Sequence, residues 1–509
     1  MISRRKILKG GAAAAVIASL PFVKPRQIFA QSALPFDYFI SAKGDDNNVG
    51  SLASPWSITA LNSKQSTYSG KRIGIIGDQG VIRYGNVGGA QTSLYALYQA
   101  QNGNNSGCVL NVGGGSASAS TYIASCHSSG AYAPRLAIID FSNPSGGAAP
   151  TQSGAAIGQN NYQYSYPRLG YVTFDGLAVC NFTFGALVMQ NYGGTMNGVV
   201  IQNCEIYNGG NVSSSNNPGA IVLNGAVNPV ISNNKIHDLQ TIPGGADPKW
   251  GLSALRTYAS SGIVFTNNTC YNCSSVLIKD ASQDFANCSY NYLDHGAFGS
   301  AGTGGDLAAG SVVGISTGSG RTSVIHHNIM LGPLYAHPQD GIPMAGAVRF
   351  YNNTIYGSSA YSGAFDAIYA DNAASGASMQ FQHNIIYAVN SYDNSQNCVY
   401  VTSNIAIAAA TFDRNVYGSN GTAVSFGRAG YQHWSFAAWR SNTGCDSNSV
   451  LVASSPFTGI PTTQVPSSFA VGSSAVIGGV TCGALDGSGL VGCDFSGSPV
   501  PSAPSLTVS

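Results

Sequence analysis

A short pattern of apolar and polar positions returns through the middle of the chain. Two apolar positions alternate with more variable ones, two asparagine positions follow, and a further apolar residue stands two places after the second asparagine. Clear copies lie at residues 230–237, 263–271, 324–330, 348–356 and 381–387, and weaker copies lie at 200–207, 290–293 and 412–417. Alternation of this kind predicts β-strands, and its return every 23 to 37 residues predicts a solenoid of stacked strands.

The second asparagine of each copy predicts how the coils are joined. This position is occupied by Cys204, Asn234, Asn268, Asn291, Asn328, Asn353 and Asn384. Where one strand bends into the next, a side-chain amide can donate to one neighbouring coil and accept from the other, so that buried polar groups stay paired. The residues two places later are expected to form an inward apolar column, which consists of Ile206, Ile236, Leu293, Met330, Ile355 and Ile386.

Two other folds are compatible with asparagine-rich turns. A β-sandwich also places asparagine in its loops, but its turns would not repeat the flanking strand pattern so faithfully. A repeated helical hairpin would keep a constant period, whereas a coil with loops of variable length would not. The sequence therefore predicts an all-β chain that forms a right-handed parallel β-helix with an asparagine ladder.

The composition fits a long coil with uncharged polar faces. The 509 residues include 64 glycines, 44% are hydrophobic and 8% are charged, whereas a charged share of about 25% is usual. A net charge of +1 argues against general nucleic-acid binding, which needs a strongly basic face. No apolar stretch reaches the roughly eighteen residues of a spanning helix, so no membrane span is expected in the mature protein.

Residues 1–30 have the features of an export signal. Arg4 and Arg5 match the twin-arginine pattern, a Gly/Ala-rich apolar run covers residues 10–23, and Ala30 ends a candidate cleavage site. An ordinary secretion signal with a chance arginine pair is the alternative. We expect residues 31–445 to form the coil and residues 446–509 to form a C-terminal capping segment, in a protein exported already folded to the periplasm or beyond.

The eleven cysteines are an odd number, so at least one thiol cannot pair within the chain. Cys108 with Cys126, and Cys482 with Cys493, are candidate disulfides. The two cysteines within residues 270–273 resemble half of a metal site, but no second Cys/His pair follows at ligand spacing. We therefore interpret them as core thiols.

Both ends of the chain resemble those of secreted β-helix proteins. Residues 38–56 resemble an edge strand and a Gly-Asp-rich turn that lead into a cap over the first coil. Residues 434–449 resemble the closing element, and residues 494–497 resemble the terminal turn. With the asparagine pattern, the chain resembles the pectate-lyase-like β-helix superfamily over nearly its whole mature length. Lyases, hydrolases, epimerases and non-catalytic coils share that fold, so the chemistry must come from individual residues.

Two cations occupy matching positions in successive copies of the pattern. Arg256 and Lys279 each stand twelve residues before a ladder asparagine. The apolar residues before them are expected to point inward, which places both cations side by side on the outer face of strands about 4.8 Å apart. Asn224 is expected near the same position one coil earlier. The resemblance implies that this outer face lines the substrate cleft.

Adjacent cations suit β-elimination on a polymer that contains uronic acid. One cation neutralises the sugar carboxylate and acidifies the neighbouring C–H, and the other, made less basic by its charged neighbour, removes the proton. Lys279 is the expected base because arginine stays protonated, and Arg256 is the expected clamp. The pair resembles the Lys and Arg on neighbouring coils of chondroitinase-B-like and alginate-lyase-like enzymes, in reversed order. The structural alternative is that Arg256 pairs with Asp280 and Lys279 caps a turn.

Further candidate ligands of the substrate lie around this cleft and in the loops 238–252 and 294–311. The candidate substrate-binding residues are Asn224, Lys249, Trp250, His295 and Asp280. Calcium, which prefers several oxygen ligands, is the candidate cofactor, with Asp280, Asp340 and Asp371 as candidate ligands. Aspartates in the same region could instead supply the acid and base of a hydrolase.

The remaining polar and aromatic positions have simpler interpretations. The sole glutamate, Glu205, aligns with Lys235 one coil later, which predicts an exposed ion pair worth about 0–1 kcal/mol. An aromatic column is expected three places after the ladder position, at Tyr207, His237, Tyr271, Tyr356 and Tyr387. Packing explains such a column better than a sugar-binding rail does.

Together these features predict a secreted, monomeric, carbohydrate-active protein with a polysaccharide substrate. The favoured activity is that of a polysaccharide lyase acting on a uronic-acid-containing polymer. The alternatives are a non-catalytic coil that binds glycan or builds an envelope layer, and an Asp-dependent glycoside hydrolase.

Overall fold

The structure is a computed structural model in which the described residues lie between positions 35 and 481. They are residues 35–83, 108–141, 155–161, 166–182, 185–211, 219–241, 252–273, 278–294, 313–332, 334–336, 344–357, 367–370, 377–388, 397–402, 410–419, 424–428, 432–452, 476–477 and 480–481. All of them belong to one compact unit, Pro35–Ala503.

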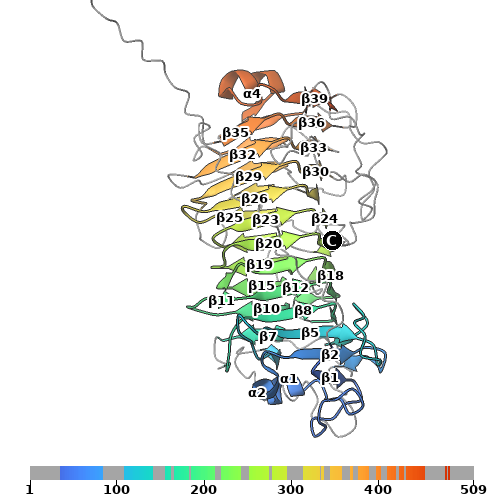
Figure 1. The fold of residues 1–509 in the computed structure, drawn as a ribbon. Helices are drawn as coiled ribbons and strands as arrows, with labels where there is room; N and C mark the ends of the chain where they lie inside the picture. Colours follow the sequence, from blue (N-terminus) through green and yellow to red (C-terminus); the bar gives the residue numbers. More distant parts are fainter. Residues whose placement is uncertain are drawn as a thin grey trace, which may run out of the picture. The chain divides into compact units, whose positions relative to one another are not determined.

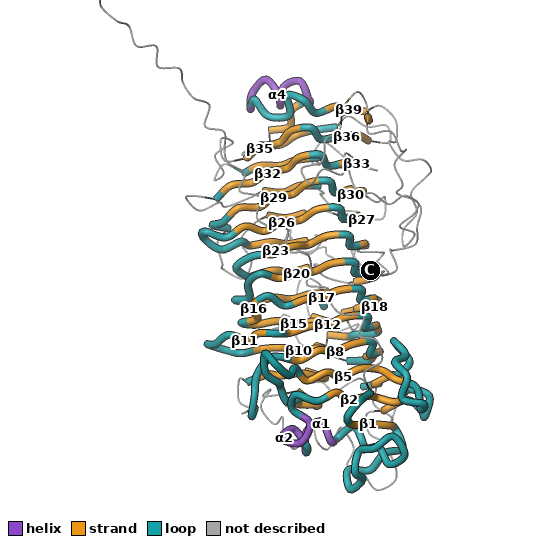
Figure 2. The backbone as a smooth tube through the Cα atoms, viewed as in Figure 1, coloured by secondary structure: helices purple, strands orange, loops and turns teal. Residues whose placement is uncertain are grey.

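Three long sheets run through this unit (Figures 1 and 2). From β4 to β36, successive coils each add one strand to each sheet, so that neighbours within a sheet come from consecutive coils. The strand pairs of these sheets are parallel, except for the antiparallel pair β37–β38. The described chain is therefore a parallel β-helix, as the sequence predicts.

Sheet 1 consists of β1 (Tyr38–Ser41), β2 (Arg72–Ile76), β5 (Thr121–Cys126), β8 (Val172–Asp175), β12 (Val199–Gln202), β17 (Val230–Ser232), β20 (Ile263–Thr266), β23 (Phe285–Ser289), β26 (Thr322–His326), β29 (Ala347–Tyr351), β32 (Ser378–Gln382) and β35 (Ala410–Asp413). Sheet 2 consists of β4 (Cys108–Asn111), β7 (Ala155–Asn160), β10 (Gly185–Gln190), β15 (Gly219–Asn224), β19 (Ser253–Tyr258), β22 (Ile278–Ala281), β25 (Val313–Ser316), β28 (Leu334–Ala336), β31 (Ile368–Ala370), β34 (Val399–Val401), β37 (Phe426–Arg428) and β38 (Gln432–Trp434).

Sheet 3 consists of β3 (Ile82–Arg83), β6 (Ile138–Asp140), β9 (Ala178–Cys180), β13 (Glu205–Tyr207), β14 (Gly210–Asn211), β18 (Lys235–Thr241), β21 (Thr269–Cys273), β24 (Tyr292–Asp294), β27 (Ile329–Leu331), β30 (Thr354–Gly357), β33 (Ile385–Ala388), β36 (Val416–Ser419) and β39 (Val450–Val452). Two short pairs complete the described strands, β11 (Met196–Asn197) with β16 (Ala226–Val227) and β40 (Val476–Ile477) with β41 (Val480–Thr481).

The asparagine positions form the predicted ladder at the bend between sheets 1 and 3. From Asn234 to Asn384, the Nδ2 atom of each ladder residue donates to the Oδ1 atom of the next over 2.9–3.2 Å. The last acceptor in this series is Asn415, which extends the ladder by one coil. The backbone N–H of each residue donates to the same oxygen, so these buried amides are paired along the whole stack.

The residue before each ladder position explains why asparagine so often occurs twice. The residues at this position have φ between 53° and 57°, and they are Asn203, Asn233, Asn267, Tyr290, His327, Asn352, His383 and Arg414. This left-handed conformation bends the chain, and asparagine adopts it more readily than most side chains do. The first asparagine of the pattern thus makes the bend, and the second joins the coils.

The expected inward column lies in the central core of the coil. Its members are all buried, and they are Ile206, Ile236, Leu293, Met330, Ile355 and Ile386. Cys270 occupies the same column between Ile236 and Leu293, so its interpretation as a core thiol is confirmed. Burial of a large apolar side chain stabilises the fold by roughly 1.5–3 kcal/mol, and the column repeats this gain in each coil.

Short helices lie at both ends of the described stack (Figure 1). Near the first strands, α1 (Ala60–Ser63) and α2 (Gln65–Tyr68) place Leu61 and Tyr68 in the core. Near the last strands, α4 (Phe436–Thr443) begins at Ser435, whose Oγ accepts from the backbone N–H of Ala438, and ends at Gly444 with a φ of 70°. Of these helices, α4 lies within residues 434–449, whereas α1 and α2 follow residues 38–56.

Asp446, just after α4, ends the ladder. Its carboxylate is buried and accepts hydrogen bonds from Asn415 Nδ2 and from Trp439 Nε1. Ser449 Oγ accepts from the backbone N–H of Asn415. The final ladder amide therefore meets acceptors supplied by the closing segment, and no further coil is needed to pair it.

One of the two expected disulfides is not formed in the structure. Cys108 and Cys126 are both free and lie in different sheets, β4 of sheet 2 and β5 of sheet 1. The candidate disulfide between them is therefore wrong. The other candidate pair, Cys482 and Cys493, lies outside the described residues.

Other expectations concern segments that are described only in part. Residues 1–30 lie outside the described range, and β39 lies within the segment expected to cap the coil. Within the described part of the chain, no helix has the length and apolar character that crossing a membrane requires.

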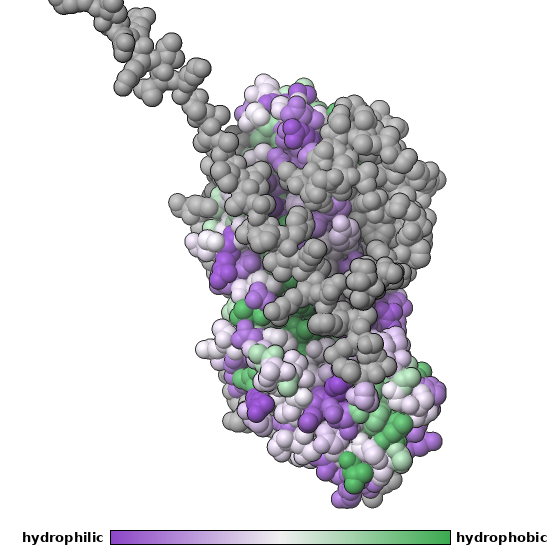
Figure 3. Space-filling model, viewed as in Figure 1, coloured by the Kyte–Doolittle hydropathy of each residue, from purple (hydrophilic) through white to green (hydrophobic). Residues whose placement is uncertain are grey.

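In the view of Figure 3, much of the coloured surface is of intermediate hydropathy, which agrees with the low charged content of the sequence.

Candidate functional site

Arg256 and Lys279 lie side by side in sheet 2. Strands β19 and β22 pair in parallel with Arg256 opposite Lys279 and Leu255 opposite Ile278. The two apolar residues belong to the central core, so alternation turns both cations to the outer face of the sheet. The structure therefore shows the strand register that the sequence predicts for this pair, and both side chains point to the predicted outer face of the sheet.

The side chains of Arg256 and Lys279 are buried and are not exposed in an open groove. Arg256 is fully buried, and Lys279 has a relative exposure of 7%. The Nε atom of Arg256 donates to the hydroxyl oxygen of Tyr258 over 2.8 Å, and its guanidinium lies 4.7 Å from the centre of the same ring. Most of the loops expected to wall the groove, 238–252 and 294–311, lies outside the described residues.

The two cations belong to one outward register position that can be followed along sheet 2, which we call the cation column. In chain order it consists of Gly158, Val188, Val222, Arg256, Lys279, Gly314, Tyr335, Tyr369, Tyr400 and Gly427. The rings of Tyr369 and Tyr400 stack with centroids 5.5 Å apart and an interplanar angle of 8°. The column thus passes from apolar to cationic to aromatic side chains.

The tyrosines of this column were missed by sequence reasoning, although a signal was present. An apolar residue, a tyrosine and a second apolar residue recur at 334–336, 368–370 and 399–401. Each triplet forms one strand of sheet 2. Following this repeat, in addition to the asparagine pattern, would have aligned the tyrosines with the cation pair.

The expected position of Asn224 needs a correction. Val222, and not Asn224, pairs with Arg256, while Asn224 pairs with Tyr258. Asn224 therefore faces outward from the same sheet, displaced by two residues along the strand from the cation column. The pairing of Ile221 with Leu255 sets this register, because both residues must face the core.

Asp280 also differs from expectation. It pairs with Thr257 on one side and Ile315 on the other, so alternation turns it inward, away from the outer face. It is fully buried and accepts a hydrogen bond from Thr257 Oγ1, which in turn accepts from Ser282 Oγ over 2.7 Å. Burial raises the pKa of Asp280 to about 7. The candidate roles of Asp280 as a substrate ligand and a calcium ligand on the outer face are therefore wrong.

The other candidates cannot be placed beside the cation pair. The residues that lie outside the described part of the chain are Lys249, Trp250, His295, Asp340 and Asp371. Among the described residues, no group of three or more His, Cys, Asp or Glu side chains could hold a metal ion.

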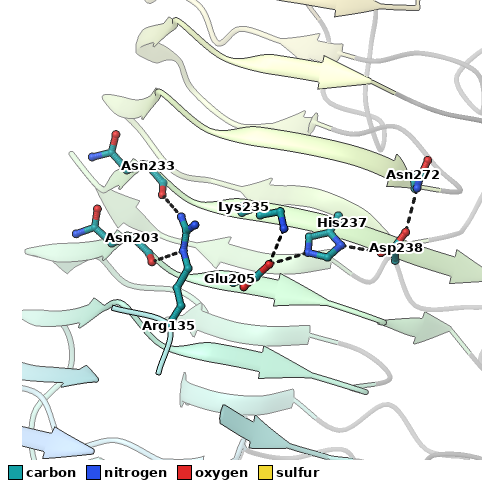
Figure 4. Close-up of polar contacts among 8 residues, drawn as sticks. All are labelled: Arg135, Asn203, Glu205, Asn233, Lys235, His237, Asp238 and Asn272. Carbon is teal, nitrogen blue, oxygen red and sulfur yellow. Dashed lines mark hydrogen bonds and ion pairs between the residues drawn. The ribbon is translucent and has the colours of Figure 1, made fainter. Parts of the chain in front are cut away.

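A second charged cluster lies on the outer face of sheet 3 (Figure 4). Glu205 accepts from Lys235 Nζ over 2.8 Å, as the aligned register predicts, and its Oε1 lies 3.1 Å from His237 Nε2. The other ring nitrogen of His237 lies 2.7 Å from Asp238, which also accepts from Asn272 Nδ2 over 3.0 Å. One network thus connects three successive coils.

The ionisation of this cluster argues for a structural role. Burial raises the pKa of Glu205, but hydrogen bonds from Lys235 and His237 lower it more, so the net pKa is below its usual value. The pKa of Asp238 is lowered in the same way, by His237 and Asn272 against burial. Neither carboxyl group is the protonated acid that glycoside hydrolysis needs at neutral pH.

The aromatic column on sheet 3 packs as expected. The ring of His237 is stacked between those of Tyr207 and Tyr271, with centroid distances of 5.5 Å and 4.7 Å. Tyr356 and Tyr387 stack at 5.9 Å. The rings thus cover one another along the stack of coils, which fits the packing interpretation.

Several solved structures are similar to this chain. A pectate lyase, Pel9A, has 14% identity over 84% of each chain and a TM-score of 0.46. A GH136 lacto-N-biosidase from Eubacterium ramulus has 12% identity, over 82% of this chain and 66% of that one, with a TM-score of 0.45. A rhamnogalacturonan lyase has 11% identity, over 84% of this chain and 92% of that one, with a TM-score of 0.42. Similarities this weak assign no activity to the chain. No protein-family model and no curated protein sequence match it.

Proposed function

We propose that this protein is a polysaccharide lyase that cleaves a uronic-acid-containing polymer by β-elimination. The observation that carries the proposal is the pairing of Arg256 with Lys279 on the outer face of sheet 2. Arg256 neutralises the carboxylate of the sugar, which makes the neighbouring C–H more acidic. Lys279 then removes that proton as the general base.

The chemistry of the two side chains supports this division of roles. Two cations in adjacent register suit an anionic ligand such as the carboxylate of a sugar. Arginine stays protonated even in such surroundings, whereas lysine loses its proton more readily when it is buried beside another cation. Arg256 is therefore assigned the clamp, and Lys279 the base.

Non-catalytic binding of an acidic glycan is the second candidate, and the burial of Lys279 favours it. A base that reaches a sugar carbon must be accessible, and Lys279 has a relative exposure of 7%. The stacked Tyr369 and Tyr400 in the cation column would also suit a binding surface, since tyrosine rings and hydroxyls both contact sugars. Activity measurements separate the two candidates.

The test is a screen of the purified protein against pectate, alginate and glycosaminoglycans. A lyase creates a carbon–carbon double bond, so the expected result is ultraviolet-absorbing product from one of these polymers. Reducing sugar without ultraviolet absorbance would identify a hydrolase and overturn the proposal. Glycan binding with neither product would establish the non-catalytic candidate.

The proposal includes export by the twin-arginine route and a place of action in the periplasm or outside the cell. Its support is the arginine pair and the apolar run of residues 1–30. A large polysaccharide is accessible to the protein only after export, so the proposed location and the proposed substrate agree.

A further inference from the structure

Tyr258 is a further polar group beside the cation pair. It stands two residues after Arg256 in β19, so it faces outward from sheet 2 as Arg256 does. Unlike the buried Arg256 and Lys279, Tyr258 is partly exposed. Tyr258 is therefore the most accessible of the three.

The contact between Arg256 and Tyr258 has a defined direction. The Nε–H of Arg256 donates to the hydroxyl oxygen of Tyr258 over 2.8 Å. A donor of this kind stabilises the phenolate more than the phenol, because it is charged and points at the oxygen that gains charge. Arg256 is thus placed to stabilise the phenolate that Tyr258 becomes when it gives up its proton.

The position of Tyr258 relative to Lys279 also suits one sugar residue. Strands β19 and β22 are adjacent, and Tyr258 pairs with Ala281, two residues after Lys279. The backbones of Tyr258 and Lys279 are therefore about 8 Å apart on the diagonal. Two long side chains at that separation can converge on neighbouring atoms of one bound sugar.

We infer that Tyr258 is the general acid of the proposed lyase reaction. Lys279 takes the proton from the carbon beside the carboxylate, and the electron pair of that C–H bond forms the new double bond. The bond from the next carbon to the glycosidic oxygen breaks, and its electron pair stays on that oxygen. Tyr258 gives its hydroxyl proton to the oxygen, and Arg256 stabilises the resulting phenolate. Protons and electrons balance without a cofactor. This inference rests on the proposed lyase function and adds the acid that the cation pair lacks.

The experiment compares Tyr258→Phe with wild type on two substrates. The first is the polymer that gives ultraviolet-absorbing product, and the second is a uronate whose C4 oxygen carries a nitrophenyl group. Nitrophenolate leaves without protonation, whereas a sugar oxygen needs an acid. Loss of a general acid costs about 10²–10⁴-fold in rate. We expect Tyr258→Phe to lower kcat on the polymer about 10²-fold or more, with KM little changed and less than about tenfold loss on the nitrophenyl ether.

Tyr271→Phe is the matched control, because Tyr271 is also partly exposed on an outer face but belongs to sheet 3. It should retain wild-type rates on both substrates. Equal losses for Tyr258→Phe on both substrates would show that Tyr258 only positions Arg256, and unchanged polymer cleavage would exclude any role, so either result overturns the inference while the lyase function stands. If wild type itself forms no unsaturated product from any of the polymers, the lyase function fails first, and the inference fails with it.

Discussion

Asp280 and Lys279 are neighbours in β22, yet their side chains meet different surroundings. Alternation turns Asp280 into the core beside Thr257 and leaves Lys279 on the outer face next to Arg256. Burial raises the pKa of Asp280 to about 7, so this carboxyl group keeps its proton where an exposed aspartate has lost it. At the scale of the residue, the face of the sheet to which a side chain points decides whether its charged group is available for chemistry.

The raised pKa of Asp280 predicts a pH-dependent stability. Below about pH 4 both states carry the proton. As the pH rises from there to about 7, the unfolded chain ionises first, so the free energy of unfolding falls, and above that range it levels off. Asp280→Asn keeps an acceptor for Thr257 without ionising. Relative to wild type, it should gain about 2–3 kcal/mol between about pH 5 and pH 8, measured by denaturant unfolding at both values.

Asp280→Ala provides the cross-check. It should be less stable than Asp280→Asn at both pH values, because it leaves a cavity and an unpaired Thr257 hydroxyl. It should nevertheless show the same gain relative to wild type as the pH rises, since it also removes the titrating group. A constant difference between wild type and both variants across the pH range would show that Asp280 does not titrate there.

The cation pair predicts two distinct kinetic defects. Lys279→Ala should lower kcat by about 10²-fold or more with little change in KM, because it removes a group used in proton transfer. Arg256→Ala should raise KM and lower kcat, because the clamp holds the carboxylate both before and during the reaction. Lys235→Ala, which removes a cation from the ion pair on sheet 3, is the matched control and should keep wild-type rates. Full activity of Lys279→Ala would remove the base assignment.

At the scale of the element, each bend between sheets 1 and 3 combines a left-handed residue with a ladder amide. The amide-to-amide bonds of the ladder run in one direction, from each Nδ2 to the Oδ1 of the later coil, and the ladder ends on Asp446. Arg135 reinforces two of these bends by donating to the carbonyl oxygens of Asn203 and Asn233 over 3.0 Å and 3.1 Å (Figure 4). Coil stacking therefore depends on side chains at one corner as well as on strand pairing.

Asn268→Leu tests the contribution of the ladder. Asn268 accepts from Asn234, and donates to Asn291 and to the carbonyl oxygen of Ile231. Leucine would leave the neighbouring amides unpaired, at a cost of about 1–3 kcal/mol in the free energy of unfolding. Asn197→Leu, at an exposed position of β11, is the control and should change stability by less than about 0.5 kcal/mol. Equal stabilities of the two variants in thermal and denaturant unfolding would contradict the structural importance of the ladder.

At the scale of the whole molecule, the described residues form a stack of coils in which each strand pairs mainly with the coils before and after it. Such a fold can lengthen without a larger core, which accounts for a chain of 509 residues. The described cysteines are free thiols, and all but Cys445 are buried. A chain that completes its fold before export would enclose these thiols before meeting an oxidising compartment.

The export proposal predicts the effect of changing the arginine pair. Replacing Arg4 and Arg5 together with lysine should leave the precursor in the cytoplasm, because the receptor of the twin-arginine route reads the pair as an address. Cell fractionation and immunoblotting would measure the distribution of precursor and mature protein. The matched control is Lys6→Arg, which keeps the pair and should be exported normally. Normal export of the double-lysine variant would assign the protein to the general secretion route.

The sequence by itself determined the coil, the ladder and the inward column. These features depend on strand alternation and on asparagine at the bend, and both are local properties that recur in each copy. Only the tertiary structure decided which polar groups lie outside and how deeply they are covered. It turned Asp280 inward, paired Val222 in place of Asn224 with Arg256, buried both cations and aligned Tyr369 and Tyr400 with them. Register between coils depends on turn length and on which residues must face the core, and a difference of two residues along a strand is enough to exchange the neighbours of a site.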